Sequence, residues 1–167
     1  VVSGDTGEAT VSPATLTFTD LIWNTAQTVT VTGVDDDVDD GDQDTTITIA
    51  VDDDNSDNAF DGVGDQTVTA TTADDDTAGF TVSQSGGSTL VTEAGSTDTF
   101  DVVLTTKPTS DVVVTVTSSD TDEARVNGTS PATLTFTDVT WDTAQTVTVT
   151  GVDDDVDDGD QDTTITI

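Results

Sequence analysis

The sequence of 167 residues predicts an all-β protein made of sandwich-like repeats in tandem. Apolar residues and threonines alternate with a period of two in many short segments, which is typical of half-buried strands. Turn signals return roughly every eight to twelve residues, the spacing found in β-sandwiches, and no segment has a convincing helical period. A long stretch of the sequence also occurs twice, which indicates a tandem repeat.

The strands are expected from this alternation, with apolar side chains inward and threonines outward. In order along the chain they are expected at residues 14–19, 28–32, 46–49, 66–70, 79–82, 99–104 and 111–116. Further strands of the second repeat are expected near 89–93, 132–137, 145–150 and 162–167. Trp23 and Trp141 lie in links between strands, where we expect them to close one end of a small core. Stacking against carbohydrate is the less favoured alternative for them.

The repeat sets the domain organisation. Residues 12–49 match residues 130–167 at an offset of 118, and only three of the 38 positions differ. Upstream, residues 5–11 lie beside residues 120–126 in the same alignment, at a shifted offset. We therefore expect residues 1–77 to be the C-terminal part of one repeat. Residues 78–167 are then the N-terminal and middle part of the next repeat, whose closing strand is expected beyond the chain end.

The composition excludes several classes of function. Thirty-five acidic residues stand against two basic ones, for a net charge of -33, so phosphate would repel the chain and nucleic acid is not an expected partner. There is no cysteine or histidine, hence no nucleophile–base set or zinc site, and no glycine-rich phosphate loop lies beside a lysine. We expect no enzyme. No apolar run approaches the roughly 18 residues of a membrane span, so direct membrane insertion is not expected.

The most unusual segment is an aspartate-rich loop at residues 33–44, repeated unchanged at residues 151–162. Seven of the ten residues from Asp35 to Asp44 are aspartates. So many carboxylates on one short loop repel one another unless a positive charge lies among them, and the chain offers almost none. Crowded carboxylate oxygens suit Ca²⁺, which takes six to eight oxygen ligands at about 2.3–2.6 Å. The loop therefore predicts a calcium site.

These residues resemble a known family. Leu-Thr-Phe-Thr is followed by tryptophan, then by Gln-Thr-Val-Thr-Val-Thr-Gly-Val-Asp-Asp-Asp, an acidic turn and a strand, and Asp74-Asp75-Asp76 closes the unit. The pattern is similar to the Calx-beta repeat of sodium/calcium exchangers, integrin beta subunits and long bacterial surface proteins. The resemblance covers essentially the whole chain. It implies an immunoglobulin-like β-sandwich of the Calx-beta type that binds Ca²⁺ at the end facing the next repeat.

The resemblance also implies a set of metal ligands, carried over by position. The first copy offers Asp5, Asp35, Asp36, Asp40, Asp74, Asp75 and Asp76, and the second offers Glu93, Asp120, Asp153, Asp154 and Asp158. The chain departs from the family at Gln43 and Gln161, which replace the last acid of the hairpin motif, so one ion position is in doubt. The loop at residues 52–62 has the Asp-x-Asn-x-Asp spacing of some calcium loops, and a plain polar turn is an equal alternative there.

From these expectations we predict a structural Ca²⁺-binding repeat of a long extracellular or cell-surface adhesin, rod or filament. Ca²⁺ would stiffen the junctions between repeats, because near-identical neighbours suit a function of length and stiffness. The expected partners are neighbouring repeats of the same chain, together with lateral or head-to-tail self-association into fibres. Two alternatives stay open: a regulatory calcium-sensing module, and an acidic repeat of a salt-adapted surface protein without specific metal sites.

Overall fold

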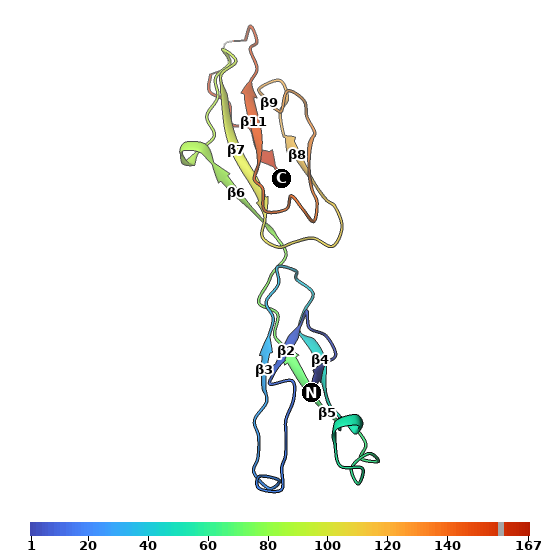
Figure 1. Cartoon of the computed structure of the whole chain (residues 1–167). Coiled ribbons are helices and arrows are strands. Elements are labelled where there is room, and N and C mark those ends of the chain that lie inside the picture. Colours follow the sequence, from blue (N-terminus) through green and yellow to red (C-terminus); the bar gives the residue numbers. More distant parts are fainter. Residues whose placement is uncertain (157–158) are drawn as a thin grey trace. The chain divides into compact units, whose positions relative to one another are not determined.

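The computed structural model describes residues 1–156 and 159–167, and these residues form an almost entirely β structure (Figure 1). They fall into two compact units: the first comprises residues 1–36 and 40–75, and the second comprises residues 37–39 and 76–167. The helical segments are two short 3₁₀ turns, η1 (Asp53–Asn55) in the first unit and η2 (Ser85–Gly87) in the second. Within the described residues, none of the helices is long and apolar enough to cross a membrane.

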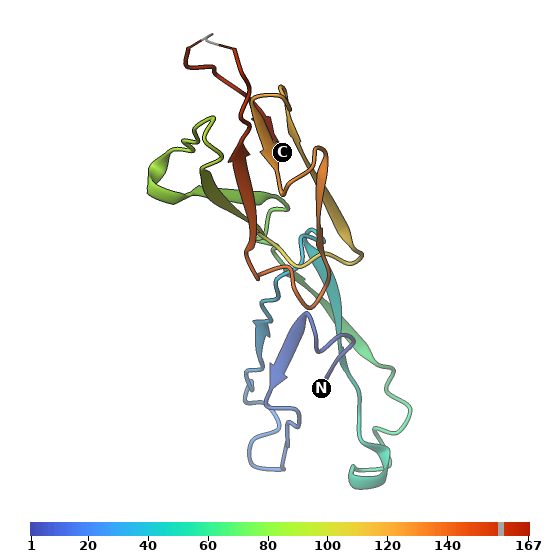
Figure 2. The same ribbon diagram turned by 90° about the horizontal axis from the view of Figure 1, so that it is seen from above.

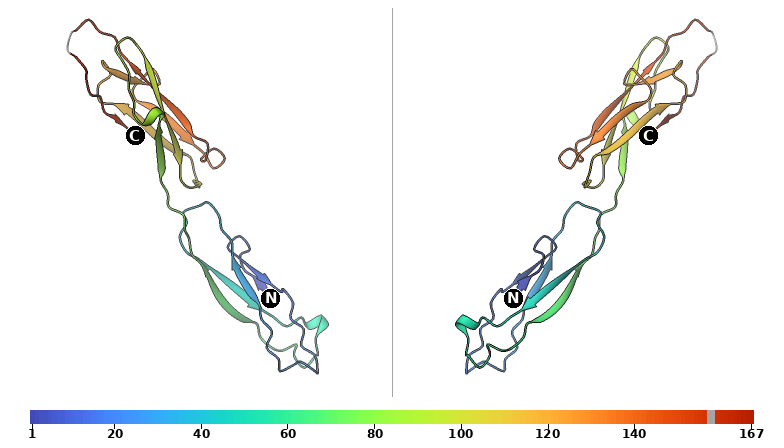
Figure 3. Two further views of the ribbon diagram at one scale, coloured as in Figure 1. Left: turned by 90° about the vertical axis from the view of Figure 1, so that its left-hand side faces the viewer. Right: turned by 90° about the vertical axis from the view of Figure 1, so that its right-hand side faces the viewer.

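The second unit is a β-sandwich of two antiparallel sheets. One sheet has the order β6-β7-β11-β9 and the other has the order β10-β8-β12. The strands are β6 (Phe80–Gln84), β7 (Thr97–Leu104), β8 (Val112–Ser118), β9 (Ala124–Val126), β10 (Ala132–Phe136), β11 (Gln145–Gly151) and β12 (Ile165–Thr166). Figure 3 shows these strands, coloured yellow-green to red, running alongside one another in two layers. The all-β sandwich predicted from the sequence is confirmed.

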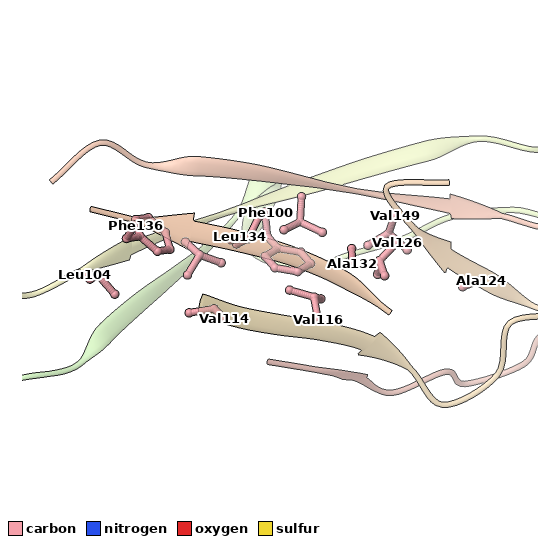
Figure 4. Close-up of a cluster of buried hydrophobic side chains, with 12 residues drawn as sticks. Phe100, Leu104, Val114, Val116, Ala124, Val126, Ala132, Leu134, Phe136 and Val149 are labelled. Atoms are coloured by element: carbon pink, nitrogen blue, oxygen red, sulfur yellow. The ribbon is translucent and has the colours of Figure 1, made fainter. Parts of the chain in front are cut away.

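The core of the second unit lies between its two sheets. Inward positions on the strands alternate with exposed threonines, so that Leu134 and Phe136 are buried while Thr133 and Thr135 are exposed. Figure 4 shows the side chains of this core pointing toward one another from strands of both sheets. Trp141 packs against the edge of the same core and is half-buried. The threonine-outward alternation thus produces one continuous apolar layer.

The first unit has the same kind of strands and far less core. Its sheets have the orders β1-β4-β5 and β2-β3. The strands are β1 (Val2–Ser3), β2 (Ala9–Ser12), β3 (Thr30–Gly33), β4 (Gln43–Ile49) and β5 (Gln66–Thr72). Its buried apolar residues are Ala9 and Ile47, and Trp23 is 70% exposed. Within this unit, the loop that carries η1 lies at the opposite end from the aspartate-rich loop (Figure 2).

The repeated sequence adopts different structures in the two units, which corrects several predicted strands. Residues 132–136 form β10, which pairs with β8, whereas the identical residues 14–18 form no strand, so the strand predicted at 14–19 is wrong. Likewise β11 has seven residues and pairs with β7, whereas its counterpart β3 has four and pairs only with β2. The physical reason is the neighbouring strand. A strand forms only where a neighbour pairs with its backbone N–H and C=O groups and helps to cover its apolar face.

The other differences from the predicted strands arise either from a missing neighbouring strand or from an alternating pattern too short to predict a strand. Residues 162–167 were predicted as a full strand, but β12 covers only Ile165–Thr166, whereas the matching β4 has seven residues paired along β5. Residues 89–93 form no strand. The short strands β1, β2 and β9 were not predicted, since none of them carries a long alternating pattern.

Candidate metal centre

The aspartate-rich loop of the first unit connects β3 to β4 and lies against the segment before β2. The backbone N–H of Val34, at the start of the loop, donates to the carbonyl oxygen of Glu8 at 2.8 Å. Gly41 turns the loop with a φ of +77°, a left-handed conformation that glycine adopts without strain. These two features place the Glu8 side chain beside the carboxylates of the loop.

Three acidic side chains meet at this point: Glu8, Asp36 and Asp40. One carboxylate oxygen from each lies within 4.8 Å of the others. Two oxygens bound to one calcium ion at about 2.4 Å can be at most about 4.8 Å apart, so no pair of these oxygens is too far apart for a shared ion. Glu8 is half-buried, and the two aspartates are exposed. Hard, anionic oxygen donors of this kind suit Ca²⁺ or Mg²⁺.

The electrostatics of the site favour a bound cation. Partial burial raises the pKa of Glu8 above its usual value, and the negative charges of Asp40, Asp36, Asp5 and Asp74 raise this pKa further. The charged form of Glu8 is therefore disfavoured in the folded protein unless a positive charge compensates it. A divalent cation among these oxygens would supply that charge.

Asp74 ties the end of β5 to the loop. Its Oδ2 accepts hydrogen bonds from the backbone N–H groups of Asp40 at 3.0 Å and Gly41 at 2.6 Å. In return, the N–H of Asp74 donates to Oδ1 of Asp42 at 3.0 Å. Two bonds from the loop backbone and one to the Asp42 side chain thus hold the loop beside Asp74, which organises the site before any ion binds.

The predicted ligands of the first copy separate into two groups. Asp36 and Asp40 belong to the triad, and Asp5 and Asp74 lie near enough for their charges to act on Glu8. Oδ1 of Asp5 accepts from the N–H of Gly7 at 2.8 Å, which fixes the turn before Glu8. The remaining predicted ligands lie outside the triad: Asp35, Asp75 and Asp76.

Glu8 itself was missed from the sequence. It lies three residues after Asp5, and Glu123 lies three residues after Asp120 in the second copy. This repeated Asp-x-x-Glu spacing is the signal that could have identified it. The aspartate-rich loop carries the denser signal in the sequence, although all of its aspartates are exposed.

The second unit repeats the backbone framework of the site. The N–H of Val152 donates to the carbonyl oxygen of Glu123 at 2.9 Å, and Oδ1 of Asp120 accepts from Asp122 at 3.0 Å. Among the residues that the structure describes, however, Glu93, Asp120, Asp153 and Asp154 form no acidic triad. Asp158, the counterpart of Asp40, lies outside the described residues. Within the described part of this unit, no segment takes the place of β5 and Asp74 beside the loop.

The loop at residues 52–62 is organised by its own hydrogen bonds. Asn55 donates from Nδ2 to Oδ2 of Asp52 at 3.0 Å, and Oδ1 of Asp57 accepts from the N–H of Ala59 at 2.9 Å. Local hydrogen bonds made by Asp and Asn side chains are typical of polar turns. No acidic triad is found in this loop, all of whose residues are described.

Comparisons of the chain with protein-family models, curated proteins and solved structures found no match.

Proposed function

We propose that the chain is a structural Ca²⁺-binding repeat of a long extracellular adhesin, rod or filament, with an immunoglobulin-like sandwich of the Calx-beta type. The observation that carries the proposal is the Glu8–Asp36–Asp40 triad, whose half-buried glutamate has a raised pKa in a chain with two basic residues. The resemblance of the aspartate loop and the Asp74–Asp76 triplet to that repeat supports the choice of Ca²⁺.

The residues that would hold the ion are the three of the triad, with oxygens of Asp5 and Asp74 close by. Bound there, Ca²⁺ supplies the positive charge that the chain lacks. The hydrogen bonds to Asp74 order the loop before an ion binds. Binding would therefore cost little conformational entropy of the loop. Water molecules and second carboxylate oxygens are the usual source of the remaining ligands of Ca²⁺.

A role in stiffening the junction between repeats rests on where the loop belongs. Residues 35–36 and 40–44 are part of the first unit, whereas Asp37–Asp39 are grouped with the second. Inside the second unit, the N–H of Lys107 donates to the carbonyl oxygen of Asp37 at 2.7 Å, and the N–H of Ala78 donates to Oδ2 of Asp39 at 2.8 Å. Asp36 and Asp40, the two aspartates of the triad, flank this three-residue segment in the sequence. We infer that Ca²⁺ restricts the link between successive repeats.

The test is thermal unfolding of the whole chain in a chelator and in increasing Ca²⁺ at constant ionic strength. Specific binding to the folded state predicts a gain of about 2.7 kcal/mol when free Ca²⁺ is a hundred times its dissociation constant. An unchanged midpoint would contradict the proposal. An equal gain from Na⁺ or Mg²⁺ at matched ionic strength would instead favour an acidic, salt-adapted repeat without specific sites.

A further inference from the structure

The turn that follows β9 interrupts the correspondence between the two copies of the repeat. Residues 120–126 align with residues 5–11, and the match resumes with Ser130 opposite Ser12, so residues 127–129 are an insertion. The inserted residues read Asn-Gly-Thr, which is the one occurrence in the chain of Asn-x-Ser/Thr, the acceptor pattern for an N-linked glycan. A pattern of three residues also arises by chance, so its structural setting decides what it can do.

The inserted residues form an exposed hairpin turn. The N–H of Thr129 donates to the carbonyl oxygen of Val126 at 2.9 Å, and φ is +48° at Asn127 and +74° at Gly128. Two successive positive φ angles closed by such a bond are typical of a type I′ turn, in which Asn-Gly is a preferred pair. Asn127, Gly128 and Thr129 are all exposed, which is the setting that a bulky N-linked glycan requires.

The side-chain amide of Asn127 is held by its oxygen, and its nitrogen is available. The N–H of Asn127 donates to the carbonyl oxygen of Thr148 at 2.8 Å, and Oδ1 of Asn127 accepts from the N–H of Thr148 at 2.9 Å. These two bonds fix the amide on the neighbouring strand β11. Among the described residues, neither Nδ2 of Asn127 nor the hydroxyl of Thr129 makes a hydrogen bond. They are the two groups that the acceptor pattern contributes, since the nitrogen carries the sugar and the hydroxyl belongs to the required Ser or Thr.

The turn lies at an open edge of its sheet. β9 is terminal in the order β6-β7-β11-β9, and in the first unit its counterpart β2 pairs with β3 alone. By the alignment of the repeat, the second unit contains the opening strands and the first contains the closing ones. Neither set provides β9 or β2 with a second neighbour among the described strands. A glycan on the turn would therefore meet no strand of its own unit, and it would shield an edge that could otherwise pair with another chain.

We propose that Asn127 is an N-glycosylation site. The donor is a sugar activated through a bond from C1 to a diphosphate carrier. Nδ2 forms a bond to C1, the bond from C1 to the diphosphate oxygen breaks, the carrier leaves with that oxygen, and Nδ2 gives up one proton to a base of the transferase. The product is still an amide, so Oδ1 keeps the hydrogen bond from Thr148. The inference needs passage through an export pathway, as proposed for this chain, and it does not depend on the metal site.

The experiment secretes the whole chain from a eukaryotic cell line behind a cleavable signal and measures its intact mass before and after treatment with a peptide N-glycosidase. We expect one glycan per chain, whose removal leaves an aspartate at position 127 in the peptide map. Thr129→Ala should abolish the modification, whereas Thr129→Ser should retain it, because the pattern requires a hydroxyl at this position. Removal of the glycan should move the midpoint of thermal unfolding by less than about 4 °C, because no hydrogen bond of the hairpin is lost.

The control places a second acceptor in the same chain. Phe60→Thr creates the pattern at Asn58, in the exposed loop at residues 52–62, and modification there shows that the chain has met the transferase. An unmodified Asn127 would overturn the proposal, most directly in a chain whose Asn58 carries a glycan. A glycan on Asn127 that persists in Thr129→Ala would also overturn it, and so would a glycosylated chain that unfolds far below the treated one.

Discussion

Glu8 is the residue whose protonation the proposed Ca²⁺ site would affect most. Its carboxylate is half-buried beside Asp36 and Asp40, and its pKa is raised. A raised pKa means that the folded state binds a proton more tightly than the unfolded state. Without metal, stability therefore rises as pH falls through the folded-state pKa of Glu8. If the triad binds Ca²⁺ as proposed, the dependence should reverse in Ca²⁺, because protons compete with the ion for the same oxygens.

Glu8→Gln should separate the effects of Glu8 with and without Ca²⁺. In chelator we expect the variant to unfold at a higher temperature than the parent chain, because one charge of a repelling cluster has been removed. In Ca²⁺ we expect its affinity for the ion to fall about tenfold or more, because a neutral amide is a weaker ligand than a carboxylate. Calorimetric titration with Ca²⁺ and thermal unfolding in chelator measure the two effects.

Asp20→Asn is the matched control for Glu8→Gln. It removes one negative charge from an exposed residue that is not part of the triad. Its effect should be small in both conditions. If the two variants behave alike in Ca²⁺, Glu8 is not a ligand.

Asp98 shows the opposite sign of pH dependence at the start of β7. Hydrogen bonds from Oγ of Ser85 and then from the N–H groups of Leu90 and Thr99 hold its pKa below the usual range. The stabilisation by this carboxylate is present above its unfolded-state pKa and is lost as pH falls through the lower, folded-state value.

Asp98→Asn should therefore lower the stability of the second unit at neutral pH and flatten its loss in acid. The amide cannot accept the same three charge-assisted bonds. Thermal unfolding between neutral and acidic pH measures both effects. Asp111→Asn is the control, since Asp111 is exposed in the same unit and should give a curve parallel to that of the parent chain. An unchanged acid limb in Asp98→Asn would show that its hydrogen bonds do not stabilise the fold.

At the scale of elements, the two copies of one sequence show which features of a strand depend on its own residues and which depend on a neighbouring strand. The alternation of residues 132–136 and 14–18 is identical, yet only the first forms a strand. Phe136 is fully buried, whereas Phe18 is 53% exposed. The pattern correctly predicted which side chains face inward once β8 pairs with β10. It could not predict whether that neighbour is present, because the neighbour lies outside the local sequence.

The candidate site shows the same limit. The density of carboxylates predicted a site at this loop, and of the predicted ligands Asp36 and Asp40 belong to the acidic triad, with Asp74 bonded to the loop beside it. The density of carboxylates could not show which aspartates of the loop belong to the site, because neighbouring residues in an extended chain point their side chains in opposite directions. Glu8 lies just before β2, outside the loop. The hydrogen bond from the N–H of Val34 to the carbonyl oxygen of Glu8 brings it beside the loop. That contact is tertiary. The sequence shows only that the Asp-x-x-Glu spacing of Glu8 recurs at Glu123.

The two phenylalanines provide a test with identical chemistry in two environments. Phe136→Ala should destabilise the second unit by about 3–5 kcal/mol, because it removes a fully buried ring from a packed core. Phe18→Ala should change the stability of the first unit by less than about 0.5 kcal/mol, because the ring is largely in solvent. Urea unfolding of both variants measures the difference. Equal losses would mean that Phe18 is buried in solution by a partner absent from the structure.

At the scale of the whole molecule, the buried core and the acidic triad are distributed unequally between the units. Twelve buried residues form the apolar core of the second unit, whereas the first buries Ala9 and Ile47 and carries the acidic triad. Domains with small cores are marginal, so we expect a bound ion to contribute a larger share of the stability of the first unit. The second unit should be stable without metal.

Calorimetry should therefore resolve two transitions in the whole chain. In chelator we expect the first unit to unfold at the lower temperature, and Ca²⁺ should move this transition up toward the second while leaving the upper one nearly in place. Thermal unfolding of a Trp23→Phe chain, followed by tryptophan fluorescence, identifies the upper transition. Its remaining tryptophan, Trp141, packs on the core of the second unit and should report only that unit. Phe136→Ala should lower the upper transition alone, and Glu8→Gln should alter the lower one alone, because distant sites contribute independently. A single transition that Ca²⁺ moves as a whole, with both variants shifting it equally, would show that the units unfold together and that the ion's effect is not confined to the first.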